Sequence, residues 1–174
     1  MSQLKVNSIV PVGGLPSGAA AGGIIQTVVG THSTQVSQSY SSEGSIQTTI
    51  TDTGLTASIT PSSNASKVLV VVHQYYGFDS DNDLQNQYNF VVRDSSNNIL
   101  DGDIGTGTEG TNRYKSLKAW YDFYHTVFVH SPSTTSSFTY KVGMNAYRQF
   151  GGTTTMYAQR HGKKSTITLM ELTG

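Results

Sequence analysis

Apolar and polar residues alternate with a period of two along most of the chain after its first 23 residues. In residues 55–60, Leu, Ala and Ile alternate with Thr and Ser. Residues 138–146 alternate in the same way, and residues 88–92 do so imperfectly. Side chains point to opposite faces along a β-strand, so each run predicts a strand with one buried face. No segment carries a convincing helical stripe, and residues 114–117 are only a weak helix candidate.

Two runs differ because large apolar side chains occupy both of their faces. Residues 68–72 read Val-Leu-Val-Val-Val, and residues 120–130 hold aromatic and aliphatic side chains at odd and even positions alike. A strand of this kind packs against the core on one face and against a second surface on the other. A partner subunit and a loop of the same chain both fit that second role, so the pattern leaves the two open.

Turn-forming residues separate the predicted strands. Residues 95–98 (Ser-Ser-Asn-Asn), 131–136 (Ser-Pro-Ser-Thr-Thr-Ser) and 160–164 (Arg-His-Gly-Lys-Lys) each interrupt the alternation. Such residues favour turns because they tolerate or stabilise turn backbone geometry. About nine strands at this spacing predict an all-β fold, an antiparallel β-sandwich, of which a jelly roll is one form. We place this domain at residues 24–174.

Residues 1–23 predict an extended N-terminal arm. They are rich in Gly, Pro and Ala, so they can bury little surface by themselves. A short apolar stretch within them fits an anchor that docks onto the sheet edge of another protein. A disordered tail is the alternative. The anchoring residues of this hypothesis are Leu4, Val6, Ile9, Val10 and Val12.

Composition narrows the class of partner. The 174 residues include 11 Lys+Arg and 11 Asp+Glu, so the net charge is zero. A neutral chain has no bulk attraction for nucleic acid or acidic membranes, and we expect neither partner. The longest aliphatic run, residues 68–72, is far too short to span a bilayer, and we expect no signal peptide. Cysteine is absent, which excludes disulfide bonds and is compatible with folding in a reducing cytoplasm.

Several motifs invite a cofactor or metal hypothesis. Residues 105–110 match the G-x-G-x-x-G pattern, but the antiparallel context provides no βαβ unit around it. Residues 79–83 begin like a calcium loop, yet Leu84 and Phe90 replace the required Gly and Glu. A calcium site of another kind, completed by other loop acids, is the alternative. The five histidines show no metal-binding spacing, and we expect no cofactor and no metal.

The sequence also lacks a clear catalytic constellation. It contains no G-x-S-x-G nucleophile elbow. Acidic residues at 79–83, Asp101, Asp103 and Glu109 could supply a pair for glycoside cleavage, but nothing favours one pair over another. We therefore predict no catalytic residues and no enzymatic activity, with a glycan hydrolase as a remote alternative.

Exposed loops are where we expect a binding surface. The basic turn at residues 160–164 could contact phosphate or carboxylate groups of a bacterial surface polymer, although a solvated hairpin tip is the simpler interpretation. Tyrosine is abundant, with ten residues, and aromatic rings stack on sugars as well as filling cores and interfaces. The candidate receptor-facing residues are Tyr76, Phe78, Asp79, Asp81, Asp83, Tyr114, Arg160, His161, Lys163 and Lys164.

Five segments, in the same order, resemble structural proteins from tailed phages of cyanobacteria and marine bacteria. They are residues 4–10 (Leu-Lys-Val-Asn-Ser-Ile-Val), 22–28 (Gly-Gly-Ile-Ile-Gln-Thr-Val), 52–72, 131–142 and 165–172. Residues 77–118 do not match and are the expected variable part. The resemblance implies a virion structural protein, commonly a homotrimer, that is attached by its N-terminus and displays a β-sandwich. It implies no catalytic residues.

The sequence contains no heptad, collagen or β-helix repeat that would build a long shaft. We therefore expect a short tail fibre, held in the virion by residues 1–23 and displaying a domain that binds the host surface. Bacterial surface glycan is the candidate ligand. The protein would be made in the host cytoplasm and end in the virion. A decoration protein of capsid or baseplate, with no receptor-binding role, is the alternative.

Overall fold

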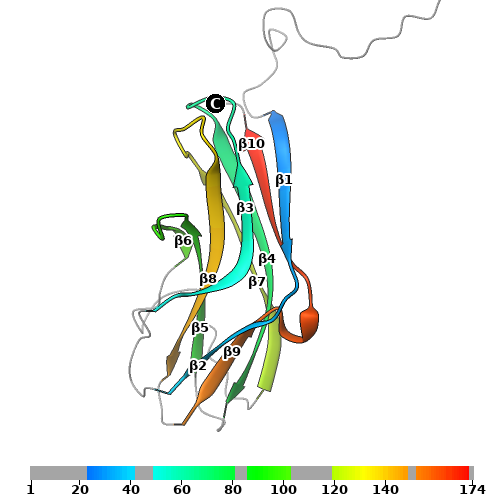
Figure 1. The fold of residues 1–174 in the computed structure, drawn as a ribbon, viewed down its shortest axis with the longest axis vertical. Helices are drawn as coiled ribbons and strands as arrows, with labels where there is room; N and C mark the ends of the chain where they lie inside the picture. The colour runs from blue at the N-terminus through cyan, green and yellow to red at the C-terminus, as the bar shows by residue number, and fades with distance from the viewer. Residues whose placement is uncertain (1–22, 42–48, 81–85, 103–118, 149–151, 173–174) are drawn as a thin grey trace, which may run out of the picture.

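The chain forms an elongated structure built almost entirely of β-strands (Figure 1). The computed structural model describes residues 23–41, 49–80, 86–102, 119–148 and 152–172. Some residues of the sequence hypotheses lie outside these ranges. They are the anchoring residues Leu4, Val6, Ile9, Val10 and Val12, and the candidate site residues Asp81, Asp83 and Tyr114.

The described residues form ten strands and one short 3₁₀ helix. The strands are β1 (Ile24–His32), β2 (Val36–Tyr40), β3 (Thr51–Ile59), β4 (Lys67–Ser80), β5 (Asn86–Asp94), β6 (Ile99–Gly102), β7 (Ala119–His130), β8 (Phe138–Arg148), β9 (Thr154–Ala158) and β10 (Ser165–Leu172), with the helix η1 (Arg160–Gly162) between β9 and β10. The hairpin expected at residues 95–98 joins β5 to β6, and Asn97 adopts a positive φ of 70° there.

The strand pairs are nested within one another. β1 pairs with β10, β2 with β9, β3 with β8, β4 with β7 and β5 with β6, all antiparallel. The chain is therefore one long hairpin whose halves run side by side. Rolling up this hairpin adds the pairs β10–β4, β4–β9 and β5–β8. Such a rolled hairpin is the defining feature of a jelly roll.

Two sheets result from this rolling. Sheet A has the order β1-β10-β4-β9-β2, with β7 also paired to β4, and sheet B has the order β3-β8-β5-β6. The predicted all-β fold, an antiparallel β-sandwich of the jelly-roll kind, is confirmed. Figure 1 shows β3 and β8 of sheet B in front of β4 and β7 of sheet A.

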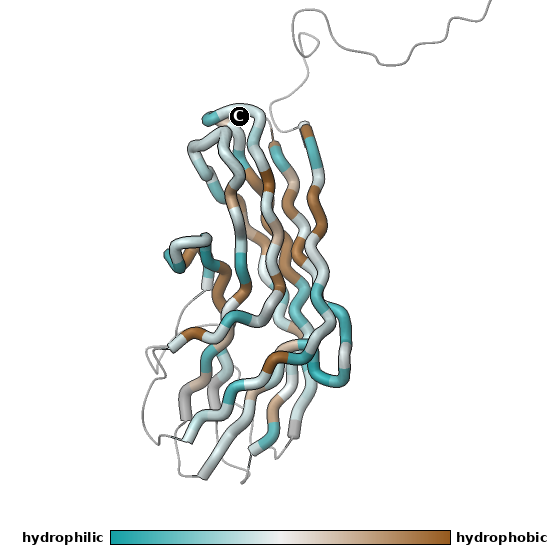
Figure 2. The backbone as a smooth tube through the Cα atoms, in the orientation of Figure 1, coloured by the Kyte–Doolittle hydropathy of each residue, from teal (hydrophilic) through white to brown (hydrophobic). Residues whose placement is uncertain are grey.

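The core lies between the inner faces of the two sheets. The even-numbered residues Val68, Val70 and Val72 of β4 are at most 1% exposed, and Tyr140 and Val142 of β8 are fully buried opposite them. The alternation in residues 55–60 therefore corresponds to one buried face, as predicted, whereas in residues 138–146 the polar Asn145 on the other face is buried as well. Figure 2 shows hydrophobic stretches along the strands of the upper half of the sandwich.

Both strands that are apolar on two faces belong to sheet A. The odd-numbered residues of β4 and β7 point away from the core, because their even-numbered neighbours face it. Val127 and Val129 of β7 remain 63% and 53% exposed. Among the described residues, no loop covers them. The outer face of sheet A is thus open around β7.

A buried carboxylate, that of Glu171, links β10 to β1 and to the segment after β3 through hydrogen bonds. Glu171 of β10 is fully buried, and its Oε1 accepts hydrogen bonds from the backbone N–H and the hydroxyl of Ser62, at 2.7 and 2.6 Å. Its Oε2 accepts a bond of 2.6 Å from the side-chain amide of Gln26 in β1. Burial alone would raise the pKa of Glu171, but bonds from Ser62, Ser66 and Gln26 outweigh it and lower the pKa to about 2.

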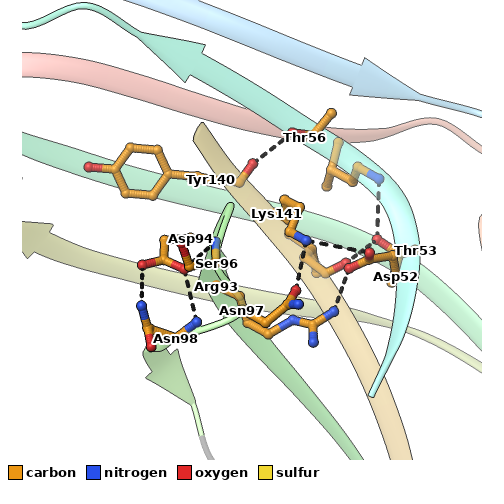
Figure 3. A network of polar contacts seen from close by, with 12 residues as sticks. Asp52, Thr53, Thr56, Arg93, Asp94, Ser96, Asn97, Asn98, Tyr140 and Lys141 are labelled. Carbon is orange, nitrogen blue, oxygen red and sulfur yellow. Dashed lines mark hydrogen bonds and ion pairs between the residues drawn. The ribbon is translucent and has the colours of Figure 1, made fainter. Parts of the chain in front are cut away.

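The outer face of sheet B is charged and polar. Arg93 of β5 donates to the carboxylate of Asp52 in β3, and the Nζ of Lys141 lies 3.6 Å from the same carboxylate (Figure 3). Lys141 also donates to the side-chain oxygen of Asn97 at 2.8 Å. Each of these charges has a partner within the network, which indicates a role in joining strands β3, β5 and β8.

Candidate functional site: an arginine cluster on sheet A

A tightly wound connection between β9 and β10 builds the candidate site. Gln159 and His161 both adopt left-handed backbone conformations, with φ of 51° and 57°, and Gly162 follows with φ of 69°. The backbone N–H of Gln159 donates to the carbonyl of Tyr75 at 2.9 Å, and that of His161 donates to the side chain of Gln35 at 3.0 Å. These bonds hold the connection against sheet A.

The Gln159 side chain anchors the connection inside the sandwich. It is fully buried, and with its amide oriented to satisfy both partners it accepts from Gln74 at 2.9 Å and donates to the carbonyl of Thr53 at 3.0 Å. Gln74 also donates to the hydroxyl of Ser165 at 3.0 Å. A buried amide without hydrogen-bond partners lowers the stability of the fold. This network therefore explains how the side chains of Gln74 in β4 and Gln159 after β9 can be buried.

Arg160 leaves the connection in the opposite direction and lies on the outer face of sheet A. Its Nη1 and Nη2 donate to the two carboxylate oxygens of Asp79 in β4, at 2.7 and 2.6 Å. The guanidinium carbon also lies 4.9 Å from the ring centroid of Tyr121 and 4.4 Å from that of Tyr157. Burial lowers the pKa of Arg160, but the bonds and charge of Asp79 more than compensate and raise it above its ordinary value.

Gly77 makes room for this arrangement. It lies opposite Tyr121 of β7 and Tyr157 of β9 in the sheet register. A Cβ added to Gly77 would lie 2.9 Å from the Cδ of Arg160 and 2.9 Å from the carbonyl oxygen of Trp120. The guanidinium can therefore lie between the two tyrosine rings only because residue 77 has no side chain.

The cluster of Asp79, Tyr121, Tyr157, Arg160 and His161, which we call the arginine cluster, is open to solvent. The Asp79 side chain is 42% exposed and Tyr121 is 43% exposed. His161 is exposed, and its Nε2 lies 3.5 Å from the hydroxyl of Tyr121. The cluster offers ring faces next to hydrogen-bonding groups, a combination suited to ligands that have apolar faces and many hydroxyls.

The structure brings together only part of the predicted site. Asp79, Arg160 and His161 meet in the arginine cluster, and Lys163 and Lys164 are exposed later in the same connection. Tyr76 and Phe78 were expected to face a receptor, and that prediction is wrong. They are 4% and 0% exposed.

The error comes from the length of β4. The strand continues to Ser80, so Tyr76 and Phe78 are even-numbered residues of its inner face. There Tyr76 contacts the ring of Phe90, with centroids 5.0 Å apart, and Phe78 stacks on Tyr88 at 4.1 Å.

Tyr121 and Tyr157 complete the cluster but are missing from the predicted site. They are 36 residues apart in sequence, and they meet because both pair with Gly77. Strand register is not visible in a single sequence. The detectable signal is a Gly within an otherwise aromatic strand segment, because such a glycine often marks a close approach of another group.

In the described part of the chain, no group of three His, Cys, Asp or Glu side chains is placed to hold a metal ion. None of the described helices is long and apolar enough to cross a membrane.

Comparisons with known proteins return only distant structural likenesses. No family model and no curated protein matches the sequence. A structure of the Gt strain of infectious bursal disease virus aligns with a TM-score of 0.45 and 11% identity, over 95% of this chain and 43% of that one. A mutant VP2 protein of the same virus, in T=1 particles, aligns with a TM-score of 0.41 and 13% identity, over 97% of this chain and 41% of that one.

A phage protein is also among the similar structures. The enzymatically active domain of tailspike protein 4 of bacteriophage CBA120 aligns with a TM-score of 0.26 and 10% identity, over 78% of this chain and 19% of that one. The chain thus spans less than half the length of each of these structures.

Proposed function

We propose that this protein is a structural and binding protein of a tailed-phage virion rather than an enzyme. In this proposal it is a short tail fibre, held in the particle by residues 1–23, whose sandwich binds a glycan of the bacterial surface. The five segments that resemble phage structural proteins support the virion assignment. The arginine cluster is the observation that carries the binding role, because it joins three predicted receptor-facing residues to two tyrosine rings on one exposed surface.

The chemistry of the cluster suits a sugar. Tyrosine rings can stack on the apolar face of a pyranose, while the exposed carboxylate of Asp79 and the imidazole of His161 can bond hydroxyl groups. Asp79 and Arg160 neutralise one another, so the cluster has little net charge and favours neutral or weakly charged polymers. Each single contact is weak, and several copies on one virion would raise the overall avidity.

Binding to immobilised bacterial polysaccharides tests this role. The full chain is expected to bind at least one polymer of a panel of lipopolysaccharides and capsular polysaccharides. Tyr157→Ala and His161→Ala should each weaken binding by about tenfold, because each removes one contact. Ile99→Ala, an exposed apolar change on sheet B, is the matched control and should bind as the parent chain does. Equal binding by all variants would contradict a sugar site at the cluster.

A passive decoration protein is the second candidate, and the open apolar face of sheet A favours it, because such a face suits contacts within a particle. Gold-labelled antibody on intact virions separates the two. Label on the tail supports host attachment. Label over the head, together with a failure to bind any polysaccharide, supports decoration.

A further inference from the structure

The outer face of sheet A carries an uncharged surface above the arginine cluster. We call it the neutral face, and it consists of the outward residues of 27–31 in β1, 166–170 in β10, 69–75 in β4 and 123–129 in β7. None of these outward residues is Asp, Glu, Lys or Arg. The sheet register aligns them in rows across all four strands, so that Val29, Thr168, Val71 and Val127 form one row.

The neutral face is also exposed. Val127, Val29 and Val129 are 63%, 57% and 53% exposed, and Phe123 is 39% exposed. The outer face of sheet B differs, because it carries the charged side chains of Asp52, Arg93 and Lys141, of which Arg93 is only 6% exposed. A sheet face without such residues, and with aliphatic side chains in register, marks a contact surface.

We propose that the neutral face binds a second copy of this chain. A charged partner would gain nothing there, because the face offers no opposite charge. Two copies of a chain with zero net charge do not repel one another. The contact does not depend on whether the arginine cluster binds glycan.

The size of the face fits such a contact. Four strands spaced about 4.8 Å apart span about 19 Å, and residues 69–75 of β4 add a length of about 23 Å, which gives a flat area of roughly 440 Å². Side-chain relief makes the accessible area larger. Stable interfaces bury about 600 to 1,000 Å² on each partner. With side-chain relief added, the neutral face therefore approaches the lower end of this range.

The strand β7 supports the same conclusion. Among the described strands it pairs only with β4, so its second edge is unpaired in sheet A. Natural edge strands avoid self-association with Lys or Pro, and residues 119–130 contain neither. Two of the three most exposed apolar residues of the neutral face, Val127 and Val129, lie on this strand. A second copy would cover them.

Sedimentation velocity of the full chain tests the proposal. The parent chain is expected to sediment as a multiple of its 18.7 kDa mass at micromolar concentration. The double variant Val127→Glu/Val129→Glu should raise the dissociation constant at least about 100-fold, because it would bury carboxylates without partners. Both positions are exposed in the single chain, so the fold should persist, as circular dichroism can verify. Ile99→Glu is the matched control on sheet B and should assemble as the parent chain does.

A parent chain that sediments as a monomer would overturn the proposal, and so would a double variant that assembles normally. If the double variant does not fold, a single Val127→Cys variant gives the answer, because the natural chain has no cysteine. With a short bismaleimide, Val127→Cys should form a covalent dimer, whereas Ile99→Cys should not. Equal cross-linking of the two variants, or none, would overturn the proposal.

Discussion

Arg160 and Asp79 are joined by two hydrogen bonds of 2.7 and 2.6 Å, although they are 81 residues apart in sequence. The pair connects the turn after β9 to the far end of β4. Two tyrosine rings border the guanidinium, and Gly77 leaves the space that it occupies. The geometry of the arginine cluster therefore depends on one planar, two-pronged side chain.

Arg160→Lys should destabilise the cluster although it preserves the charge. Lysine cannot form the paired bonds to Asp79, and its ammonium group cannot stack as a plane on the rings. Because Asp79 is partly exposed, we expect a loss of about 1 kcal/mol, which lowers Tm by about 3 °C in a domain of this size. Thermal melts followed by circular dichroism measure this change. Lys163→Arg, in the same connection, is the control, and equal melting of both variants would contradict the role of the planar group.

Stability should fall at acidic pH because of Glu171. Its pKa is about 2 in the folded chain against 4.5 for the ordinary group, so the unfolded chain binds more protons between these values. The stabilisation is complete above pH 4.5 and disappears as the pH falls toward 2, and it amounts to about 3 kcal/mol. Denaturant unfolding across this range should show the loss. Glu171→Gln should be less stable at neutral pH and less sensitive to acid, and an unchanged acid dependence would assign the effect to other carboxylates.

The alternating pattern of the sequence was sufficient to predict the fold, because alternation reports which face of a strand is buried. It was not sufficient to predict where β4 ends. The aliphatic run predicted a strand only over residues 68–72, and Tyr76 and Phe78 beyond it were placed in an exposed loop. Gln74 fits inside because Gln159 and Ser165, distant in sequence, satisfy its amide. When the hydrogen-bond partners of a buried polar residue are distant in sequence, the residues around it give no signal that it is buried.

Only part of the arginine cluster could be predicted from the sequence, and the reason is related. A basic turn and an acidic segment are visible in the sequence, and they supplied Arg160, His161 and Asp79. Tyr121 and Tyr157 depend on the register of β7 and β9 against β4. The same limit applies to His73 and His125, which lie directly opposite one another in the structure but show no metal-binding spacing in the sequence.

Deletion of residues 1–22 should leave the sandwich folded. All strands of the described structure lie between Ile24 and Leu172, and so does the core cluster. We expect Tm to change by less than about 2 °C, within the range of surface changes. Complementation of a phage that lacks the gene should yield virions without the truncated protein. A truncated chain that no longer folds, or that is incorporated normally, would contradict the anchoring role of this segment.

Self-association through the neutral face should weaken at mildly acidic pH. His73 and His125 lie within this face, with ring centroids 4.3 Å apart. Along their row they face Thr166 and Thr31, and along β4 and β7 their neighbours are Tyr75 and Phe123, so no carboxylate on the face stabilises a protonated ring. Burial lowers the pKa of His73, and the charge of His125 lowers it further. A second copy would bury His73 further and lower its pKa again, so the separated chain would bind protons more readily than the assembled one.

Sedimentation at about pH 7.5 and about pH 5.5 measures this effect, and the dissociation constant should rise at the lower pH by about tenfold or more. His73→Gln/His125→Gln should assemble with little pH dependence, because glutamine keeps a polar side chain of similar size without a titrating ring. Glu171, with its pKa of about 2, does not titrate in this window and cannot cause the change. Identical pH dependence in the parent chain and the double variant would assign the effect to histidines outside the neutral face, such as His130, whose pKa is also lowered by burial.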